Sequence, residues 1–188
     1  MAKIYYKFGA MKSGKSMDCL RAIYNYRENN KKVLVLKPTV DTRAKNVESR
    51  SGASTECLGI SPCDWKLNII RFASEEKPDV IIIDEAQFLT KQQVESLRYF
   101  AYEKDIPVLC YGLAVDYSSH LFEGSKRLFE LADDVQELLG ICGCGRRAKQ
   151  NARKGLHGFV KQGASIEIGD AQYVPLCNKC YYEKVDNQ

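Results

Sequence analysis

The feature that most constrains the fold is a glycine-rich motif near the N-terminus. Its eight residues are Gly9-Ala10-Met11-Lys12-Ser13-Gly14-Lys15-Ser16, which fit the phosphate-binding pattern G-x-x-x-x-G-K-[ST]. In such a loop the glycines let successive backbone N–H groups turn toward phosphate oxygens, and the following helix presents its positive N-terminal end. Lys15 can then reach the β- and γ-phosphates of a nucleotide, and Ser16 can ligate Mg²⁺. The alternative is a glycine turn that only joins a strand to a helix.

Short apolar runs alternate with amphipathic stretches over residues 1–140, which predicts a mainly parallel β-sheet flanked by helices. The predicted strands are Ile4 to Phe8, Val33 to Leu36, Val80 to Ile83 and Ile106 to Tyr111. The predicted helices are Ser16 to Asn29, Trp65 to Glu76 and Lys91 to Lys104, the last with a capping box from Thr90 and Gln93. Residues 45–61 lack helical periodicity and predict a long loop or a hairpin arm.

A second motif follows the apolar strand Val80 to Ile83, which ends in Asp84-Glu85-Ala86-Gln87-Phe88. An apolar strand that ends in an acid is typical of the Walker B pattern, in which Asp84 would hold Mg²⁺ directly or through water. Glu85 lies one residue further, where a carboxylate can accept a proton from an attacking hydroxyl or water. The alternative for Glu85 is a solvated loop acid.

Four of the eight cysteines form two tight pairs near the C-terminus, Cys142-Gly143-Cys144 and Cys177-Asn178-Lys179-Cys180. Four thiolates can give Zn²⁺ its tetrahedral shell, and the second pair has the usual C-x₂-C spacing. The first pair is one residue shorter, and reduced thiols or a redox pair remain alternatives. We expect Cys19 and Cys110 to be ordinary core residues.

The overall charge and hydropathy exclude several classes of protein. The net charge of +4 is too small to indicate a nucleic-acid partner by itself. A stretch from Arg146 to Lys161 is basic and lies in a segment without acids, so it is either a phosphate-facing patch or a solvated surface. No apolar run approaches the roughly 20 residues of a membrane span, and the N-terminus lacks the apolar core of a signal peptide. We therefore expect a cytoplasmic protein with no membrane partner.

Taken together, the motifs resemble those of the zinc-bearing (type II) class of thymidine kinases over nearly the whole chain. The motifs follow the family's order along the chain. First come the phosphate loop with Met11, the segment Lys37-Pro38-Thr39-Val40-Asp41-Thr42-Arg43, and Asp84 to Phe88. Then come Gly112-Leu113 through Asp116-Tyr117 and Phe122, and finally the four cysteines, which enclose Ile168-Gly169 and Tyr173.

The resemblance implies a RecA-like P-loop NTPase core over residues 1–140 and a small zinc-binding lasso domain over 141–188. It implies ATP- and Mg²⁺-dependent phosphorylation of the 5′-hydroxyl of thymidine, and of deoxyuridine, in nucleotide salvage for DNA synthesis. It also implies a structural Zn²⁺, feedback inhibition by thymidine triphosphate and a homotetramer. From the small net charge and the chain length we expect no nucleic-acid partner.

The resemblance also assigns roles to individual residues. Glu85 matches the catalytic base and Arg43 an arginine that arranges the phosphates. The implied ATP-binding residues are Gly9, Ala10, Met11, Lys12, Ser13, Gly14, Lys15, Ser16, Asp41, Asp84, Glu85, Ala86 and Gln87, with Ser16, Asp41 and Asp84 around Mg²⁺. The implied nucleoside-binding residues are Met11, Phe88, Leu113, Tyr117, Phe122, Asn151, Ile166, Glu167, Ile168, Gly169 and Tyr173, and the zinc ligands are Cys142, Cys144, Cys177 and Cys180.

Several residues depart from the family pattern. The first cysteine pair is C-x-C rather than C-x-x-C, Tyr117 replaces a phenylalanine, and Asn151 replaces a small hydroxyl residue. These departures concern specificity more than reaction class. The competing class is a nucleic-acid motor or binding module, which the chain length disfavours because 188 residues leave no room for a second motor core. A third class, a structural protein with a degenerate loop, is disfavoured by the intact Gly14-Lys15-Ser16.

Overall fold

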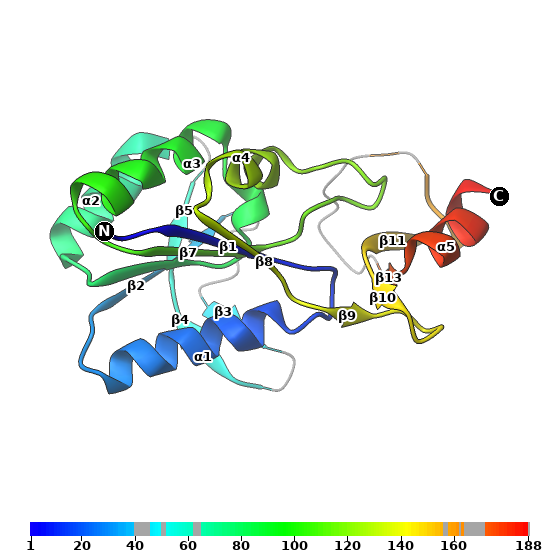
Figure 1. Ribbon diagram of the computed structural model, residues 1–188, viewed down its shortest axis with the longest axis horizontal. Helices are drawn as coiled ribbons and strands as arrows, with labels where there is room; N and C mark the ends of the chain where they lie inside the picture. The colour runs from blue at the N-terminus through cyan, green and yellow to red at the C-terminus, as the bar shows by residue number, and fades with distance from the viewer. Residues whose placement is uncertain are drawn as a thin grey trace.

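The computed structural model describes residues 1–39, 46–49, 52–61, 65–155, 158–161, 163 and 172–187. Its centre is a six-stranded parallel sheet of order β5-β2-β6-β7-β1-β8 (Figure 1). These strands are β1 (Ile4–Phe8), β2 (Val33–Pro38), β5 (Leu58–Ile60), β6 (Val80–Ile83), β7 (Val108–Gly112) and β8 (Asp134–Glu137). The predicted parallel sheet is thus confirmed.

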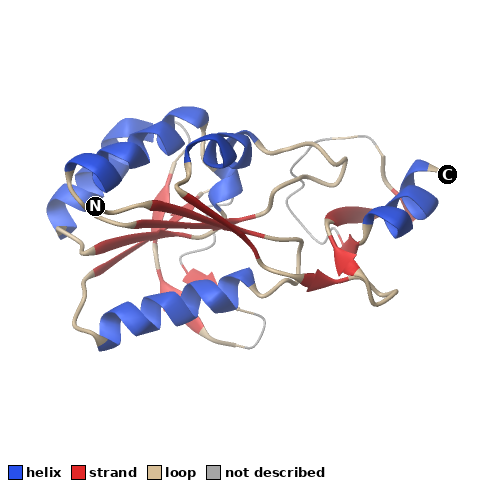
Figure 2. Ribbon diagram, viewed as in Figure 1, coloured by secondary structure: helices blue, strands red, loops and turns tan. Residues whose placement is uncertain are grey.

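Helices cover both faces of this sheet (Figure 2). On one face lies α1 (Lys15–Glu28), and on the other lie α2 (Trp65–Glu76), α3 (Lys91–Arg98) and α4 (Glu123–Leu131). Strand β6 is apolar throughout because it is buried from both sides: Val80 and Ile82 pack with residues of α1, whereas Ile81 and Ile83 pack with residues of α2 and α3.

The predicted helices are confirmed, with small shifts at their ends. Helix α3 begins with the predicted capping box, since Thr90 Oγ1 accepts from Gln93 N at 3.2 Å and Gln93 Oε1 accepts from Thr90 N at 2.9 Å. After Arg98 the chain continues as a π-helical turn, η2 (Tyr99–Glu103), rather than as regular α-helix. Strand β7 begins at Val108 and not at Ile106, because Pro107 has no N–H for the ladder.

Residues 46–60 form the predicted hairpin in their described part, and also a strand that the sequence did not indicate. Strands β3 (Asn46–Glu48) and β4 (Ser54–Glu56) pair antiparallel. Strand β5 then joins the edge of the main sheet beside β2. Helix α4 and the edge strand β8 were also not predicted; β8 is short and has only one apolar residue, Val135.

The C-terminal part of the chain lies at one end of the main sheet (Figure 1). It contains the pair β9 (Gly140–Ile141) and β10 (Arg147–Ala148), and a three-stranded antiparallel sheet of order β12-β11-β13. The remaining elements are β11 (Gln150–Gly155), β12 (Gly158–Phe159), β13 (Gln172–Leu176), α5 (Asn178–Tyr181) and the π-helical turn η3 (Tyr182–Asp186). Among the described residues, no helix has the length and apolar character to cross a bilayer.

Candidate active site

The phosphate loop joins β1 to α1 and encloses the Lys15 ammonium group. Gly14 has a φ of 83°, a backbone conformation that glycine adopts without steric penalty, and α1 begins at the next residue. Lys15 Nζ donates to the carbonyl oxygens of Gly9 at 3.0 Å and Ala10 at 2.8 Å. A cation and a helix N-terminus therefore face the same small volume, which suits a phosphate group.

Helix α1 is held to the sheet by a partly buried ionic cluster around Asp18. Asp18 Oδ2 accepts from Lys7 Nζ of β1 at 2.7 Å and from the Tyr111 hydroxyl of β7 at 3.1 Å, and Asp18 Oδ1 accepts from Arg21. Burial alone would raise the pKa of Asp18, but the hydrogen bonds from Lys7 and Arg21 outweigh it and hold this pKa below its ordinary value. The cluster fixes the first turn of α1, and hence the phosphate loop, relative to two strands.

Asp84 and Glu85 follow β6 directly, beside the phosphate loop. Asp84 is 4% exposed, and burial together with the negative charge of Glu85 raises its pKa to about 6. A divalent cation would offset both effects, so the residues present fit a Mg²⁺ site. Glu85 has a φ of 54°, an uncommon conformation for a residue with a side chain. Such backbone strain persists only where the surroundings hold the residue in place.

Glu85 is held in place by Gln87, which lies in the short 3₁₀ turn η1 (Ala86–Phe88). The Gln87 side chain is buried; its Nε2 donates to Glu85 Oε2, and its Oε1 accepts from the backbone N of Leu113 at 3.0 Å. The Leu113 carbonyl in turn accepts from the Tyr6 hydroxyl at 2.9 Å and from Ser125 Oγ at 2.6 Å. Glu85 is therefore fixed through Gln87 to the end of β7 and to α4.

One cavity of about 640 Å³ brings the predicted site residues together. Its predicted lining residues are Met11, Lys12, Gly14, Lys15, Ser16, Glu85, Gln87, Phe88, Leu113, Tyr117, Phe122, Asn151 and Tyr173. The rings of Phe88 and Phe122 meet edge to face with centroids 5.6 Å apart, forming an apolar wall. The cavity thus joins an end suited to a phosphate group to an end suited to a flat apolar group.

The remaining predicted residues fall into two groups. The described residues Gly9, Ala10, Ser13, Asp84 and Ala86 shape the loops but are not among the residues that line the cavity. The predicted Asp41, Arg43, Ile166, Glu167, Ile168 and Gly169 lie outside the described residues.

Five lining residues were missed from the sequence: Met17, Glu48, Ser49, Val115 and Asp116. Glu48 and Ser49 come from the β3–β4 hairpin, which packs near α1. Asp116 Oδ1 accepts from Ser118 N, Ser118 Oγ and His120 N, so it shapes the loop that carries Tyr117. The sequence carries no spacing signal for the hairpin residues, because their proximity depends on how the arm folds back.

Tyr117 lines the cavity on one side and contacts the C-terminal part of the chain on the other. The Arg153 guanidinium lies 4.0 Å from the centre of the Tyr117 ring, a cation–π contact, and the Tyr181 hydroxyl donates to the Tyr117 carbonyl at 2.5 Å. Arg153 is 7% exposed. The other described members of the basic stretch are on the surface; Arg147, for example, pairs with Glu137. For these residues the structure favours the solvated surface over the phosphate-facing patch.

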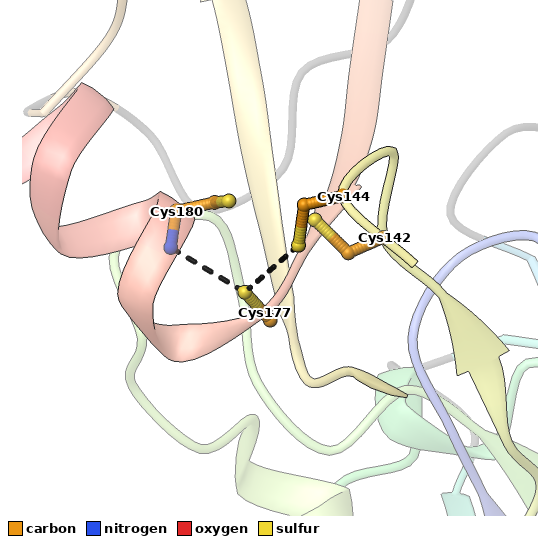
Figure 3. A group of neighbouring side chains, drawn as sticks. All are labelled: Cys142, Cys144, Cys177 and Cys180. Carbon is orange, nitrogen blue, oxygen red and sulfur yellow. Dashed lines mark hydrogen bonds between the residues drawn. The ribbon is translucent and has the colours of Figure 1, made fainter. Parts of the chain in front are cut away.

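The four C-terminal cysteines converge from the turn that follows β9 and from the start of α5 (Figure 3). Their sulfur atoms all lie within 4.8 Å of one another, and the Sγ atoms of Cys144 and Cys177 are 3.6 Å apart. Zinc–sulfur bonds of about 2.3 Å in a tetrahedron place sulfurs about 3.8 Å apart. The short first pair therefore reaches a zinc-binding arrangement, aided by the turn at Gly145, whose N donates to the Cys142 carbonyl at 2.8 Å.

Hydrogen bonds within this cluster shift the thiol pKa values in opposite directions. The backbone N–H of Cys180 donates to Cys177 Sγ at 3.4 Å and is the main reason that the pKa of Cys177 falls to about 6. Neighbouring sulfurs of Cys144 and Cys177 raise the pKa of Cys180 to about 12. Four adjacent thiolates repel one another, so a cation such as Zn²⁺ would be needed for all four to be deprotonated together. The seven cysteines within the described ranges all carry free thiols.

Comparison with known proteins identifies the family of this site. A family model described as thymidine kinase matches residues 2–181. The chain belongs to the thymidine kinase family.

It is 41% identical over 189 residues to a thymidine kinase of Haemophilus influenzae, with 98% of each chain covered. It is 39% identical over 188 residues to a thymidine kinase of Streptococcus pyogenes, covering 97% of this chain and 98% of the relative. It is also 38% identical over 190 residues to one from Rhodopirellula baltica, covering 98% of this chain and 90% of the relative. The cysteine cluster is consistent with the zinc-bearing class of the family, as predicted.

Proposed function

We propose that the chain transfers the γ-phosphoryl group of ATP to the 5′-hydroxyl of thymidine, as a thymidine kinase of nucleotide salvage. The observation that carries this proposal is the shared cavity, because Lys15, Glu85 and the wall formed by Phe88 and Phe122 line one space. Phosphorylation of a nucleoside requires a group that binds phosphate, a group that accepts a proton and a surface that holds the base. Family membership over residues 2–181 supports the same activity.

ATP binds with its phosphates on the loop 9–16 and on the N-terminus of α1 in this proposal. Lys15 exchanges its contacts with the Gly9 and Ala10 carbonyls for the β- and γ-phosphates. Ser16 and Asp84, together with Asp41, would hold Mg²⁺, which when bound neutralises charge that develops on the phosphates. Arg43 is proposed to help arrange the phosphates.

Glu85 is the proposed base that orients the 5′-hydroxyl and accepts its proton as the new O–P bond forms. The carboxylate borders the cavity, and its hydrogen bond to Gln87 restricts its orientation. Positioning of this kind contributes strongly to phosphoryl transfer, in which the protein performs little covalent chemistry.

The nucleoside base is proposed to lie against Phe88, Phe122, Tyr117 and Leu113, with Tyr173 and residues 166–169 closing over it. Stacking on aromatic rings suits a flat pyrimidine. Deoxyuridine lacks only the methyl group of thymidine, and such a difference changes transition-state binding by about 1–3 kcal/mol. We therefore propose deoxyuridine as a second, poorer substrate.

Residues 141–188 are proposed to act as a zinc-binding lasso domain beside a kinase core of residues 1–140. Its packing against Tyr117 through Arg153 and Tyr181 supports a role in shaping the nucleoside end. Zinc would do no chemistry there; it would hold the lid that keeps water from the γ-phosphate. We further propose a cytoplasmic homotetramer that is inhibited by thymidine triphosphate in the nucleoside pocket.

The test is incubation of the purified protein with γ-labelled ATP and either thymidine or single-stranded DNA. We expect label in thymidine monophosphate, and no stimulation of ATP hydrolysis by DNA. DNA-stimulated hydrolysis without labelled thymidine monophosphate would reject the proposal in favour of a nucleic-acid motor.

A further inference from the structure

We propose that Asn151 is a positioning residue that couples the zinc-binding end of the chain to the phosphate loop, so that zinc occupancy sets the affinity for ATP. This inference rests on the proposed function, since it assumes that the loop binds ATP. It goes beyond a role of zinc in closing over the nucleoside, because it assigns an effect at the opposite, phosphate end of the cavity.

The Asn151 side chain bridges two loops that are distant in sequence. Its Oδ1 accepts from the backbone N of Met11 at 2.7 Å, and its Nδ2 donates to the carbonyl of Val115 at 3.2 Å. The residue lies on β11 opposite Pro175 of β13, the strand that runs into Cys177, and is 2% exposed. An amide carries its acceptor and donor on different atoms, so one side chain joins both loops to the C-terminal sheet.

A second contact links the same two regions. Ala10, the residue before Met11, is 4% exposed and belongs to a hydrophobic cluster with Cys142, Ala152 and Cys177. The start of the phosphate loop, at Ala10, is therefore part of the hydrophobic core that surrounds the cysteine cluster. Loss of the metal would loosen this core and the anchor of Asn151 together, because cores of small metal-bound units depend on the metal for folding free energy.

The bond to Met11 matters for ATP because Met11 lies within the phosphate loop and lines the cavity. A phosphate cradle works only if its peptide groups keep their orientation when phosphate arrives. Removal of Asn151 Oδ1 leaves the partly buried Met11 N–H without this acceptor. Loss of this hydrogen bond, with the Met11 N–H left in place, corresponds to about a tenfold loss of ATP affinity if the whole effect falls on ATP binding.

The experiment measures ATP·Mg²⁺ binding by titration calorimetry, without thymidine, for the wild type and Asn151→Ala. Each protein is measured with zinc and after treatment with a chelator that prefers zinc to magnesium. We expect zinc removal to weaken ATP binding about 10-fold in the wild type. Asn151→Ala should be about 10-fold weaker with zinc present, and zinc removal should then change its affinity by less than about 3-fold.

Gln150→Ala is the matched control. Gln150 lies on the same strand; its Oε1 accepts from Ser119 Oγ at 3.0 Å and its Nε2 donates to Asn178 Oδ1 at 3.3 Å. This variant therefore also removes two bonds from β11 to neighbouring segments, but neither of them reaches the phosphate loop. We expect Gln150→Ala to bind ATP as tightly as the wild type does, and to lose about 10-fold in ATP affinity when zinc is removed. Amide hydrogen exchange by NMR gives a readout without ATP: the Met11 N–H should be protected in the wild type and in Gln150→Ala, and should exchange faster in Asn151→Ala.

Two results would overturn the inference while leaving the proposed function intact. One is a folded Asn151→Ala protein that binds ATP as the wild type does. The other is an equal effect of zinc removal on both proteins. If Asn151→Ala does not fold, Asn151→Ser is measured in the same way, since its shorter side chain cannot span both loops. A wild type that binds no ATP would instead reject the proposed function.

Discussion

Replacement of Gln87 by alanine should uncouple catalysis from nucleotide binding. The side chain is 2% exposed and makes two hydrogen bonds, one to Glu85 and one, 3.0 Å long, from the backbone N of Leu113. Its removal leaves the Leu113 N–H without this acceptor, which lowers the free energy of unfolding by about 1–3 kcal/mol. It also releases Glu85, whose φ of 54° is held by its surroundings.

The expected kinetic effect is a fall in kcat on the order of 100-fold, because a displacement of about 1 Å in a reacting group has an effect of that size. The Kd for ATP should stay within about 3-fold of the wild type, since Gln87 makes no contact with the phosphate loop in the hydrogen bonds described above. Both quantities are measurable, kcat by a coupled assay of ADP release at saturating thymidine and Kd by calorimetry.

Gln93→Ala is the matched control for this prediction. Gln93 is also buried, at 1% exposure, and its amide also makes two backbone contacts, accepting from Thr90 N and donating to Ser61 O at 3.1 Å. It caps α3, away from the cavity lining. We expect a similar loss of stability with unchanged kcat. An unchanged kcat in Gln87→Ala, or an equal loss of kcat in Gln93→Ala, would refute the argument that Gln87 orients Glu85.

Three further predictions follow from the site geometry. Gly112→Ala would place a methyl group 2.7 Å from Gln87 Oε1, so it should lower both the melting temperature and kcat, with a loss of stability of about 1–3 kcal/mol that thermal unfolding would measure. Tyr117→Phe keeps the ring over Arg153 and should leave the KM for thymidine within about 3-fold, whereas Tyr117→Leu removes the cation–π contact and should raise this KM about 10-fold in steady-state assays. Metal analysis should find one zinc per chain, and Cys144→Ser should lose zinc and lower the melting temperature; wild-type zinc content in that variant would contradict the four-cysteine site.

The sequence predicts the parts of this molecule whose signals are local. The loop at Gly14-Lys15 and the strand ending in Asp84 are specified by contiguous residues, and the parallel sheet follows from alternating elements. The capping box at Thr90 is equally local, and its hydrogen bonds are present. The cysteine pairs are two local motifs whose chemistry predicts that they meet.

Contacts between distant segments escape such reasoning. The bond between Asn151 and Met11 spans 140 positions, and the bond between Gln87 and Leu113 spans 26. Each depends on side-chain direction at a loop, which no periodicity encodes. Strand β8 was missed because only partners in the sheet identify a four-residue, largely polar edge strand.

The proposed role of Glu85 is to accept the proton of the nucleoside hydroxyl in a cavity shared with the phosphate loop. Rapid-quench measurement of thymidine monophosphate formed in a single turnover by Glu85→Gln, which keeps the size and loses the charge, tests it directly. We predict a rate at least about 100-fold below the wild type with an unchanged Kd for ATP. A wild-type rate of thymidine monophosphate formation in Glu85→Gln would show that Glu85 is not the proton acceptor.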